Sequence, residues 1–185
     1  MGGMFSIIPD AERGRVKAVL AILEQGAFDE AILRFNEIID GVYSNEAKAF
    51  GRYGAAVALM RRHVELGQGR PEDVDTAIAH YEACLDELKF GDAYLMLGMA
   101  LEVKMGQLHL NSPGAVQPDE ELLGLAERAV AMFEEVAELH PGLKGHAAEE
   151  IHRLEPIIAG LKERLVPRRR GASTFDQLTT EGPLT

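Results

Sequence analysis

Apolar residues recur at intervals of three and four positions along nearly the whole of this 185-residue chain, and this spacing constrains its fold more than any other feature. Residues three and four apart share one face of an α-helix, whereas a half-buried β-strand alternates apolar and polar residues. The chain shows no sustained alternation and no Asn-Gly or Asp-Gly turn between alternating runs. We therefore expect an all-α fold.

Capping and turn residues divide this pattern into seven helices. Asp10 and Ser44 are suitable N-caps, and Pro71 is suited to the first turn of a helix. Pro156 lies inside the last segment, where a proline kinks or splits a helix. The expected helices span residues 10–25, 28–40, 45–66, 71–91, 92–110, 119–140 and 145–166.

Residues 1–166 are expected to form one helical domain, because 46% of the chain is hydrophobic and 26% is charged, a balance typical of compact proteins. From Pro167 onward the sequence is rich in Pro, Gly, Ser and Thr and loses helical periodicity. Residues 167–185 are therefore predicted to be an extended or disordered tail. Three arginines give this tail a charge of +1, against −12 for the residues before it.

Charge and composition exclude several classes of function. A net charge of −11 argues against nucleic-acid binding, which needs clustered Lys and Arg. Cys84 is the only cysteine, so neither an intramolecular disulfide nor a cysteine-based zinc site is expected. No stretch approaches the roughly 18 apolar residues of a membrane span, and we expect a soluble cytoplasmic protein. The start "MGGMFS" fits the N-myristoylation pattern through Gly2 and Ser6, although so short a pattern also occurs by chance.

The sequence offers no candidate for catalysis or metal binding. None of its six histidines lies three or four residues from another, the spacing that presents two imidazoles to one metal from a helix. Nucleophile elbows, phosphate-binding loops and dinucleotide-binding glycine motifs are absent. We therefore expect a protein that is not an enzyme and that binds no metal or cofactor.

One residue pattern recurs along the chain. Its first half is an aromatic residue, a residue pair ending in Gly and a further large residue, and its second half is Ala-x3-aromatic. Two copies contain both halves, and a third copy contains only the second half. Its members are Tyr94, Leu97, Gly98, Leu101, Ala129 and Phe133, then Phe50, Tyr53, Gly54, Val57, Ala77 and Tyr81, and finally Ala31 and Phe35. Small residues leave room where neighbouring helices cross, and the bulky residues fill the core between them.

This pattern, with Pro141 after its last copy, resembles the tetratricopeptide repeat (TPR). The resemblance implies a right-handed α-solenoid of about three antiparallel helix pairs with a C-terminal capping helix. In a TPR, the corresponding Gly and Ala are about a dozen residues apart. Here Gly54 and Ala77 are 23 residues apart, and Gly98 and Ala129 are 31 residues apart. Either the first helices are overlong or the connections near residues 61–71 and 105–118 are enlarged.

The resemblance also implies a concave groove lined by the first helix of each pair. Its apolar wall would consist of Leu95, Met96, Met99 and Val103. Methionine suits such a wall because its side chain is flexible and polarizable. The alternative is that these four residues pack beneath the connection that follows them or against the capping helix.

The same register places four cations on the groove. Lys48 and Arg52 come from the second pair, and Arg13 and Lys17 follow by extrapolation to the first. Lys48 and Arg52 are similar to the basic half of the carboxylate clamp of some TPR domains, but the accompanying asparagines are not recognisable. The alternative is that all four are solvated surface charges.

These expectations converge on a protein-interaction module, a scaffold or assembly adaptor that binds a peptide or helix of a partner protein. The partner would present an acidic group to Lys48 and Arg52 and an apolar anchor to Leu95, Met96 and Met99. One alternative is a structural homo-oligomer built through the repeat faces or the tail. Another is a helical enzyme whose site comes from the two long connections.

Overall fold

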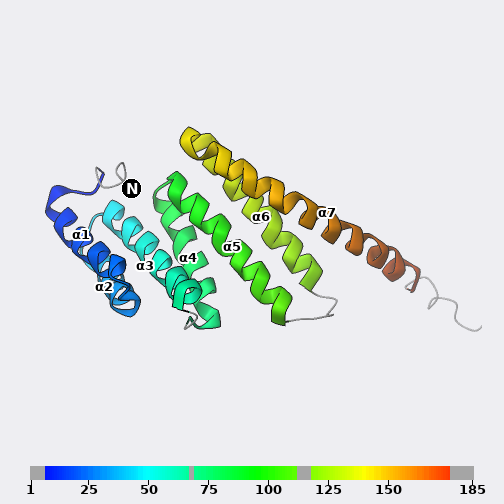
Figure 1. The fold of residues 1–185 in the computed structure, drawn as a ribbon, viewed down its shortest axis with the longest axis horizontal. Coiled ribbons are helices and arrows are strands. Elements are labelled where there is room, and N and C mark those ends of the chain that lie inside the picture. Colours follow the sequence, from blue (N-terminus) through cyan, green and yellow to red (C-terminus); the bar gives the residue numbers. More distant parts are fainter. Residues whose placement is uncertain (1–6, 67–68, 112–117, 176–185) are drawn as a thin grey trace, which may run out of the picture.

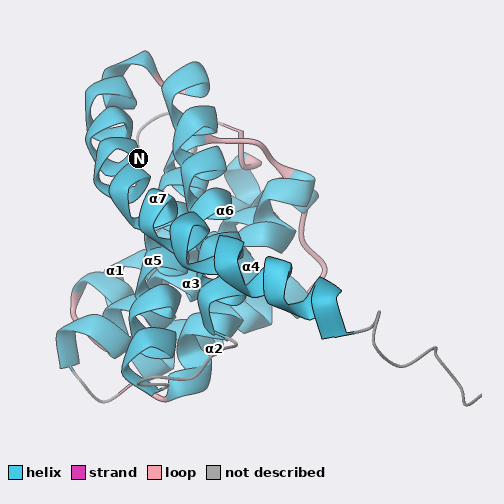
Figure 2. Cartoon of the chain, turned by 90° about the vertical axis from the view of Figure 1, so that its right-hand side faces the viewer, coloured by secondary structure: helices cyan, strands magenta, loops and turns pink. Residues whose placement is uncertain are grey.

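The computed structural model describes residues 7–66, 69–111 and 118–175. Within these ranges the chain forms only helices and their connections, so the all-α expectation is confirmed (Figure 2). The helices are α1 (Asp10–Glu24), α2 (Phe28–Asp40), α3 (Asn45–Leu66), α4 (Pro71–Glu87), α5 (Gly91–Asn111), α6 (Pro118–Leu139) and α7 (Lys144–Phe175), and the 3₁₀ turn η2 (Pro141–Leu143) lies between α6 and α7. None of the helices in the described part combines the length and apolarity that a bilayer-spanning segment requires.

Each helix packs against the next along the chain, so that α1 to α7 form a row with the first and last helices at opposite ends (Figure 1). Contacts at both ends of α3 show that its neighbour α4 is antiparallel. Arg52 near the start of α3 meets Glu87 at the end of α4, and Arg62 near the end of α3 meets Asp73 at the start of α4. Arg62 also meets Asp29 at the start of α2, and Lys104 of α5 meets Asp75 at the start of α4. Gly91 at the start of α5 lies beside His140 after α6, and Arg164 of α7 meets Asp119 at the start of α6. Neighbours from α2 to α7 therefore alternate in direction.

Two glycines allow the close helix crossings that the repeat pattern predicts. A Cβ atom on Gly54 of α3 would lie within 3.0 Å of three ring carbons of Phe35 on α2. A Cβ on Gly98 of α5 would lie 2.7 Å from Cε1 of Phe133 on α6. The predicted role of these glycines is confirmed, because any larger residue would displace an aromatic ring that fills the core.

The long spacing between the small residues of each repeat comes from the helices themselves. α3 has 22 residues and α5 has 21, so each continues for several turns beyond its crossing glycine. Most of the spacing therefore lies within helices, in the long first helices α3 and α5 together with the parts of α4 and α6 that precede Ala77 and Ala129. α3 and α5 bring additional side chains beyond the crossing points, and these side chains contribute to the candidate site.

The predicted end of the last helix is wrong. α7 continues through Pro156 and Pro167 to Phe175, so the predicted boundary at residue 166 and the predicted extended tail do not hold for residues 167–175. A proline removes one backbone donor, but the residues on both sides can remain helical, and the three arginines that follow Pro167 are good helix formers. The remainder of the predicted tail, and Gly2 and Ser6 of the myristoylation pattern, lie outside the described residues.

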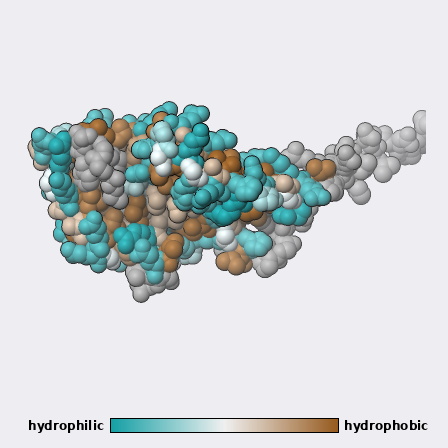
Figure 3. Space-filling model, turned by 45° about the horizontal axis from the view of Figure 1, so that its top comes forward, coloured by the Kyte–Doolittle hydropathy of each residue, from teal (hydrophilic) through white to brown (hydrophobic). Residues whose placement is uncertain are grey.

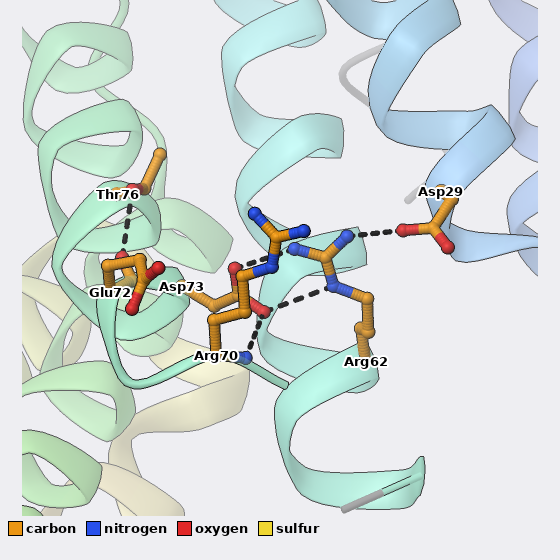
Figure 4. A network of polar contacts seen from close by, with 6 residues as sticks. All are labelled: Asp29, Arg62, Arg70, Glu72, Asp73 and Thr76. Atoms are coloured by element: carbon orange, nitrogen blue, oxygen red, sulfur yellow. Dashed lines mark hydrogen bonds and ion pairs between the residues drawn. The ribbon is translucent and has the colours of Figure 1, made fainter. Parts of the chain in front are cut away.

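Two polar contacts explain where α3 and α4 begin. The Ser44 hydroxyl accepts a hydrogen bond from the Ala47 backbone N–H at 3.2 Å, which confirms Ser44 as an N-cap. The buried Asp73 carboxylate accepts the Arg70 backbone N–H at 3.0 Å and two guanidinium N–H groups of Arg62 (Figure 4). Arg62 also pairs with Asp29 of α2, so one guanidinium joins α2, α3 and α4.

Candidate functional site

Helix α5 contacts four other helices and leaves one strip of its surface uncovered. The contacts that define its neighbours are Gly98 with Phe133 of α6, Glu102 with Arg153 of α7, Lys104 with Asp75 of α4, and Gln107 with His63 of α3. Successive residues of an α-helix are rotated by about 100°. This rotation places Leu95, Met99, Val103 and Gly106 between the sides that face α7 and α3. Met99, in the middle of the strip, is 40% exposed.

The predicted apolar wall therefore lies on one strip of one helix. Leu95, Met96 and Val103 are half-buried and pack against the hydrophobic core, and Met99 projects furthest into solvent. These four residues therefore lie close together on α5.

Arg52, one of the predicted groove cations, is already paired within the protein. Its Nη1 atom lies 2.7 Å from both carboxylate oxygens of Glu87 at the end of α4. Lys48 lies one turn earlier on the same side of α3 and is half-buried. This pairing turns Arg52 toward α4, and no described contact connects it with the apolar strip of α5.

The two cations predicted from the first helix do not join that strip either. Arg13 Nε donates to the Ile8 carbonyl oxygen at 2.7 Å, and its Nη1 lies 2.5 Å from the Asp10 carboxylate. Lys17 is exposed on α1. Arg13 therefore helps to hold the chain that enters α1.

Sequence reasoning missed a cleft that lies between α5 and α7. Both helices pack on α6 and diverge beyond the contact of Glu102 with Arg153, which leaves a cleft of about 450 Å³. Its apolar lining includes Met105, Leu122, Leu154, Ile157 and Leu161. All of these are buried except Ile157, which is 41% exposed at the mouth. Figure 3 shows one face of the molecule, on which hydrophobic areas lie among hydrophilic ones.

Glycines on both walls keep this cleft open. A Cβ on Gly106 of α5 would meet nothing within 4 Å, and one on Gly160 of α7 would meet only Arg164 Nη1 at 3.8 Å. A glycine inside a helix costs about 1 kcal/mol relative to alanine, but Gly14 and Gly124 have equally open surroundings, so helical glycines alone do not mark the cleft in the sequence. Only the packing of α5 and α7 on α6 brings Gly106 and Gly160 to one cleft.

The rim of the cleft carries a network of charges. Arg153 pairs with Glu102 and, at 2.6 Å, with Glu150, while Arg164 pairs with Asp119 at 3.3 Å. Burial raises the pKa of Glu102, and its hydrogen bond with Arg153 opposes that shift. Oε1 of Glu102 is enclosed by the protein and has no hydrogen-bond partner among the described residues. The charged groups that the rim exposes are mainly Arg153 and Arg164, which are 55% and 56% exposed, whereas Glu102 and Asp119 are only 16% and 14% exposed.

Other reactive groups in the described residues do not form a chemical site. No group of three or more His, Cys, Asp or Glu side chains there is arranged to hold a metal ion. Cys84 is buried, and its burial raises the thiol pKa to about 12, which leaves a negligible thiolate fraction near neutral pH. Cys84 behaves as a small apolar core residue.

Comparisons with known proteins do not identify the function of this chain. No family model matches the chain. No curated protein and no solved structure matches it either.

Proposed function

We propose that this chain is a TPR-like helical-repeat module that binds one helical segment of a partner protein. In this proposal α1 with α2, α3 with α4, and α5 with α6 are the three pairs, and α7 is the capping helix. The crossing glycines Gly54 and Gly98 and the alternating row of helices support the repeat assignment. The outer face of α7 supports the cap, because Glu149, His152 and Glu163 are exposed there and solenoid ends need a polar face.

The cleft between α5 and α7 is the observation that carries the binding proposal. Both helices are antiparallel to α6 and hence parallel to each other, so the cleft is a trough with an apolar floor. An amphipathic helix lays residues at i, i+3 or i+4, and i+7 into such a trough. Gly106 and Gly160 permit the close approach of a helix backbone, since packed helices lie about 8–10 Å apart.

The predicted apolar strip and the cleft form one continuous surface. Leu95, Met99 and Gly106 follow one another along the uncovered side of α5, and Gly106 already belongs to the cleft. At about 1.5 Å per residue, the distance from Leu95 to Gly106 is about 16 Å, which equals about three turns of a bound helix. The proposed site thus retains the apolar half of the predicted groove and replaces its basic half with the α7 wall.

The test uses NMR spectroscopy of protein with labelled methyl groups and a panel of synthetic amphipathic helical peptides. A bound helix is expected to shift the methyl signals of Met99, Met105 and Ile157 and to leave those of Val19 and Ile38 unchanged. Gly106→Leu fills the trough and is expected to abolish these shifts without unfolding the protein, since leucine is a better helix former than glycine. Gly14→Leu, which also has open space around it but lies on α1, is the matched control.

Two outcomes would overturn the proposal. One is that no peptide in the panel shifts the cleft methyl groups. The other is that the Gly106→Leu variant binds peptides as tightly as the wild-type protein. Analytical ultracentrifugation of the free protein tests the alternative that the chain is a structural homo-oligomer, because self-assembly would make the sedimentation coefficient depend on protein concentration.

A further inference from the structure

The α7 wall of the cleft exposes two arginines and encloses the carboxylates with which they pair. Arg153 and Arg164 have more than half of their side-chain surface exposed, and both line the cleft. Their partners Glu102, Glu150 and Asp119 have less than a fifth exposed. A ligand that enters the cleft from solvent therefore meets the guanidinium groups and not the carboxylates.

Each of these arginines keeps one guanidinium nitrogen for a further partner. Arg153 uses Nε and Nη2 for its two carboxylates, and Arg164 uses the same two atoms for Asp119. Neither Nη1 atom has a hydrogen bond with another of the described residues. A Cβ on Gly160 would lie 3.8 Å from Arg164 Nη1, which places this nitrogen along the cleft wall. A guanidinium has five N–H donors, so both arginines can bind a carboxylate of a ligand without releasing their own partners.

The two arginines lie on one side of α7, at opposite ends of its apolar wall. They are eleven residues apart, which corresponds to about 1100° of rotation, or about 20° more than three full turns. At about 1.5 Å per residue, they are about 16 Å apart along the helix axis. Ile157 and Leu161 lie between them and line the same cleft. The wall therefore presents a cation, two apolar residues and a second cation in order.

We propose that the helix bound in the α5–α7 cleft is acidic and carries two carboxylates about three turns apart, one on Arg153 and one on Arg164. This inference rests on the proposed function and specifies the chemistry of its partner. The apolar residues of the bound helix lie over Met105, Ile157 and Leu161, between the two charged contacts. Hydrogen bonds between arginine and carboxylate are charge-assisted and directional, so the two contacts fix the position of the helix along the cleft.

The net charge of the chain, −11, opposes an acidic partner, but local contacts outweigh it at this cleft. Exposed charges more than about 10 Å away are largely screened at about 0.1 M salt. Coulomb energy falls with distance, and a ligand carboxylate touches a guanidinium while the enclosed carboxylates lie farther away. A basic helix would instead place its cations against the exposed guanidinium groups of Arg153 and Arg164.

The inference keeps the acidic partner that the sequence led us to expect and assigns its carboxylates to a different helix. That expectation depended on Lys48 and Arg52 of α3. Arg52 is paired with Glu87 on the α4 side of α3, and no described contact connects it with the apolar strip. The arginines of α7 lie beside the apolar floor, so one bound helix reaches both kinds of surface.

Four synthetic helical peptides that share one leucine face provide the test. Two polar positions eleven residues apart flank this face, and they are Glu in the first peptide, Gln in the second and Lys in the third. The fourth peptide has the composition of the first, with the two Glu moved to the opposite side of the helix. Fluorescence anisotropy measures binding, and the methyl signals of Met105 and Ile157 verify that each peptide occupies the cleft.

We expect the Glu peptide to bind at least about tenfold more tightly than the Gln peptide and the peptide with moved Glu, and the Lys peptide to bind most weakly. Attraction by the net charge of −11 alone predicts the reverse order, with Lys tightest and Glu weakest. A preference for the Glu peptide therefore cannot come from general charge. This comparison uses the wild-type protein and needs no variant.

Arg164 and Lys162 offer a matched pair of variants on α7. Both side chains are 56% exposed, and both pair with a carboxylate of α6. Lys162 lies outside the cleft, beside Leu165 and Val166. Arg164→Gln is expected to weaken the Glu peptide about fivefold and to change the Gln peptide by less than about twofold. Lys162→Gln removes the same charge and is expected to change either affinity by less than about twofold, and thermal melting verifies that both variants are folded.

The outcomes distinguish this inference from the proposed function. If the Gln or Lys peptide shifts the cleft methyl groups and binds as tightly as the Glu peptide, the cleft binds helices but the acidic partner is wrong. If the peptide with moved Glu binds as tightly as the first, or if Arg164→Gln and Lys162→Gln weaken the Glu peptide equally, the arginine contacts are refuted. If none of the peptides shifts the cleft methyl groups, the proposed function fails together with the inference.

Discussion

Arg62 on α3 holds the buried carboxylate of Asp73 on α4 with two guanidinium nitrogens, at 3.0 Å and 2.6 Å (Figure 4). The Asp73 side chain is only 5% exposed, and the same guanidinium reaches the exposed Asp29 of α2. Its hydrogen bonds with Asp73 and Asp29 raise the pKa of Arg62. One arginine thus connects three consecutive helices at the end of α3, near the start of α4.

The two partners of Arg62 should differ strongly in their effect on stability. Asp73→Ala leaves a partly buried guanidinium without its main partner and is expected to lower the free energy of unfolding by about 3–5 kcal/mol. Asp29→Ala removes an 85% exposed partner and is expected to change it by less than about 1 kcal/mol. Urea denaturation of both variants measures the difference, and equal losses would contradict the assignment of Asp73 as the buried anchor.

The crossing of α5 and α6 depends on the absence of a side chain at Gly98. Gly98→Leu forces a large group against Phe133 and is expected to cost about 1–3 kcal/mol of stability, with a lower melting temperature. Gly124→Leu in α6 makes the same chemical change where a Cβ meets nothing within 4 Å. Both variants gain helix propensity, so the difference between their unfolding free energies isolates overpacking. A difference near zero would contradict the placement of Gly98 at the interface between α5 and α6.

Ser44 has two bonding roles at the start of α3. Its hydroxyl accepts the Ala47 N–H, and it donates to Glu12 of α1 at 2.6 Å. Ser44→Ala removes both contacts and is expected to cost about 1–2 kcal/mol, whereas Ser44→Thr retains a hydroxyl and is expected to cost about 0.5 kcal/mol or less. Thermal unfolding followed by circular dichroism compares the two variants. Equal melting temperatures for them would show that the hydroxyl contributes nothing.

Alkaline pH should destabilise the fold through one buried thiol and two buried phenols, which lose their protons at high pH. Burial is the main cause that raises the pKa of Cys84 from its ordinary 9.0 to about 12, and burial also raises the pKa of Tyr53 and Tyr81 above their ordinary 10.0. The unfolded chain releases these protons at lower pH than the folded chain does. Stability is therefore complete below about pH 9 and falls as the pH rises toward the folded values.

Two measurements check this pH dependence. The unfolding free energy in urea is expected to decrease between pH 8.5 and pH 10.5, assay values chosen on either side of the ordinary thiol and phenol pKa values. Cys84→Ala removes one of the three ionisable groups and should make the decrease shallower. In the folded protein at pH 8, Cys84 should resist alkylation by iodoacetamide, and it should react fully in denaturant. Rapid alkylation without denaturant would refute the burial of the thiol.

Local features of the structure could be predicted from the sequence because they depend on residues near one another in the chain. Helical periodicity and caps such as Ser44 identified the helices, and the helix interior positions of Gly54 and Gly98 identified two close crossings. The same periodicity placed Leu95, Met99 and Val103 on one strip of α5. In each case a rotation of about 100° per residue is sufficient to tell which side chains share a face.

Other features were decided only when helices distant in sequence came together. Periodicity identifies the face of a helix but not its neighbour, so it could not reveal that Glu87 neutralises Arg52 or that Arg153 reaches Glu102. Nor could it reveal the α5–α7 cleft, which exists because two helices pack on α6 and then diverge around Gly106 and Gly160. Helix formation depends on local hydrogen bonds and side-chain spacing, whereas charge pairing and cavity shape depend on the directions in which packed helices run.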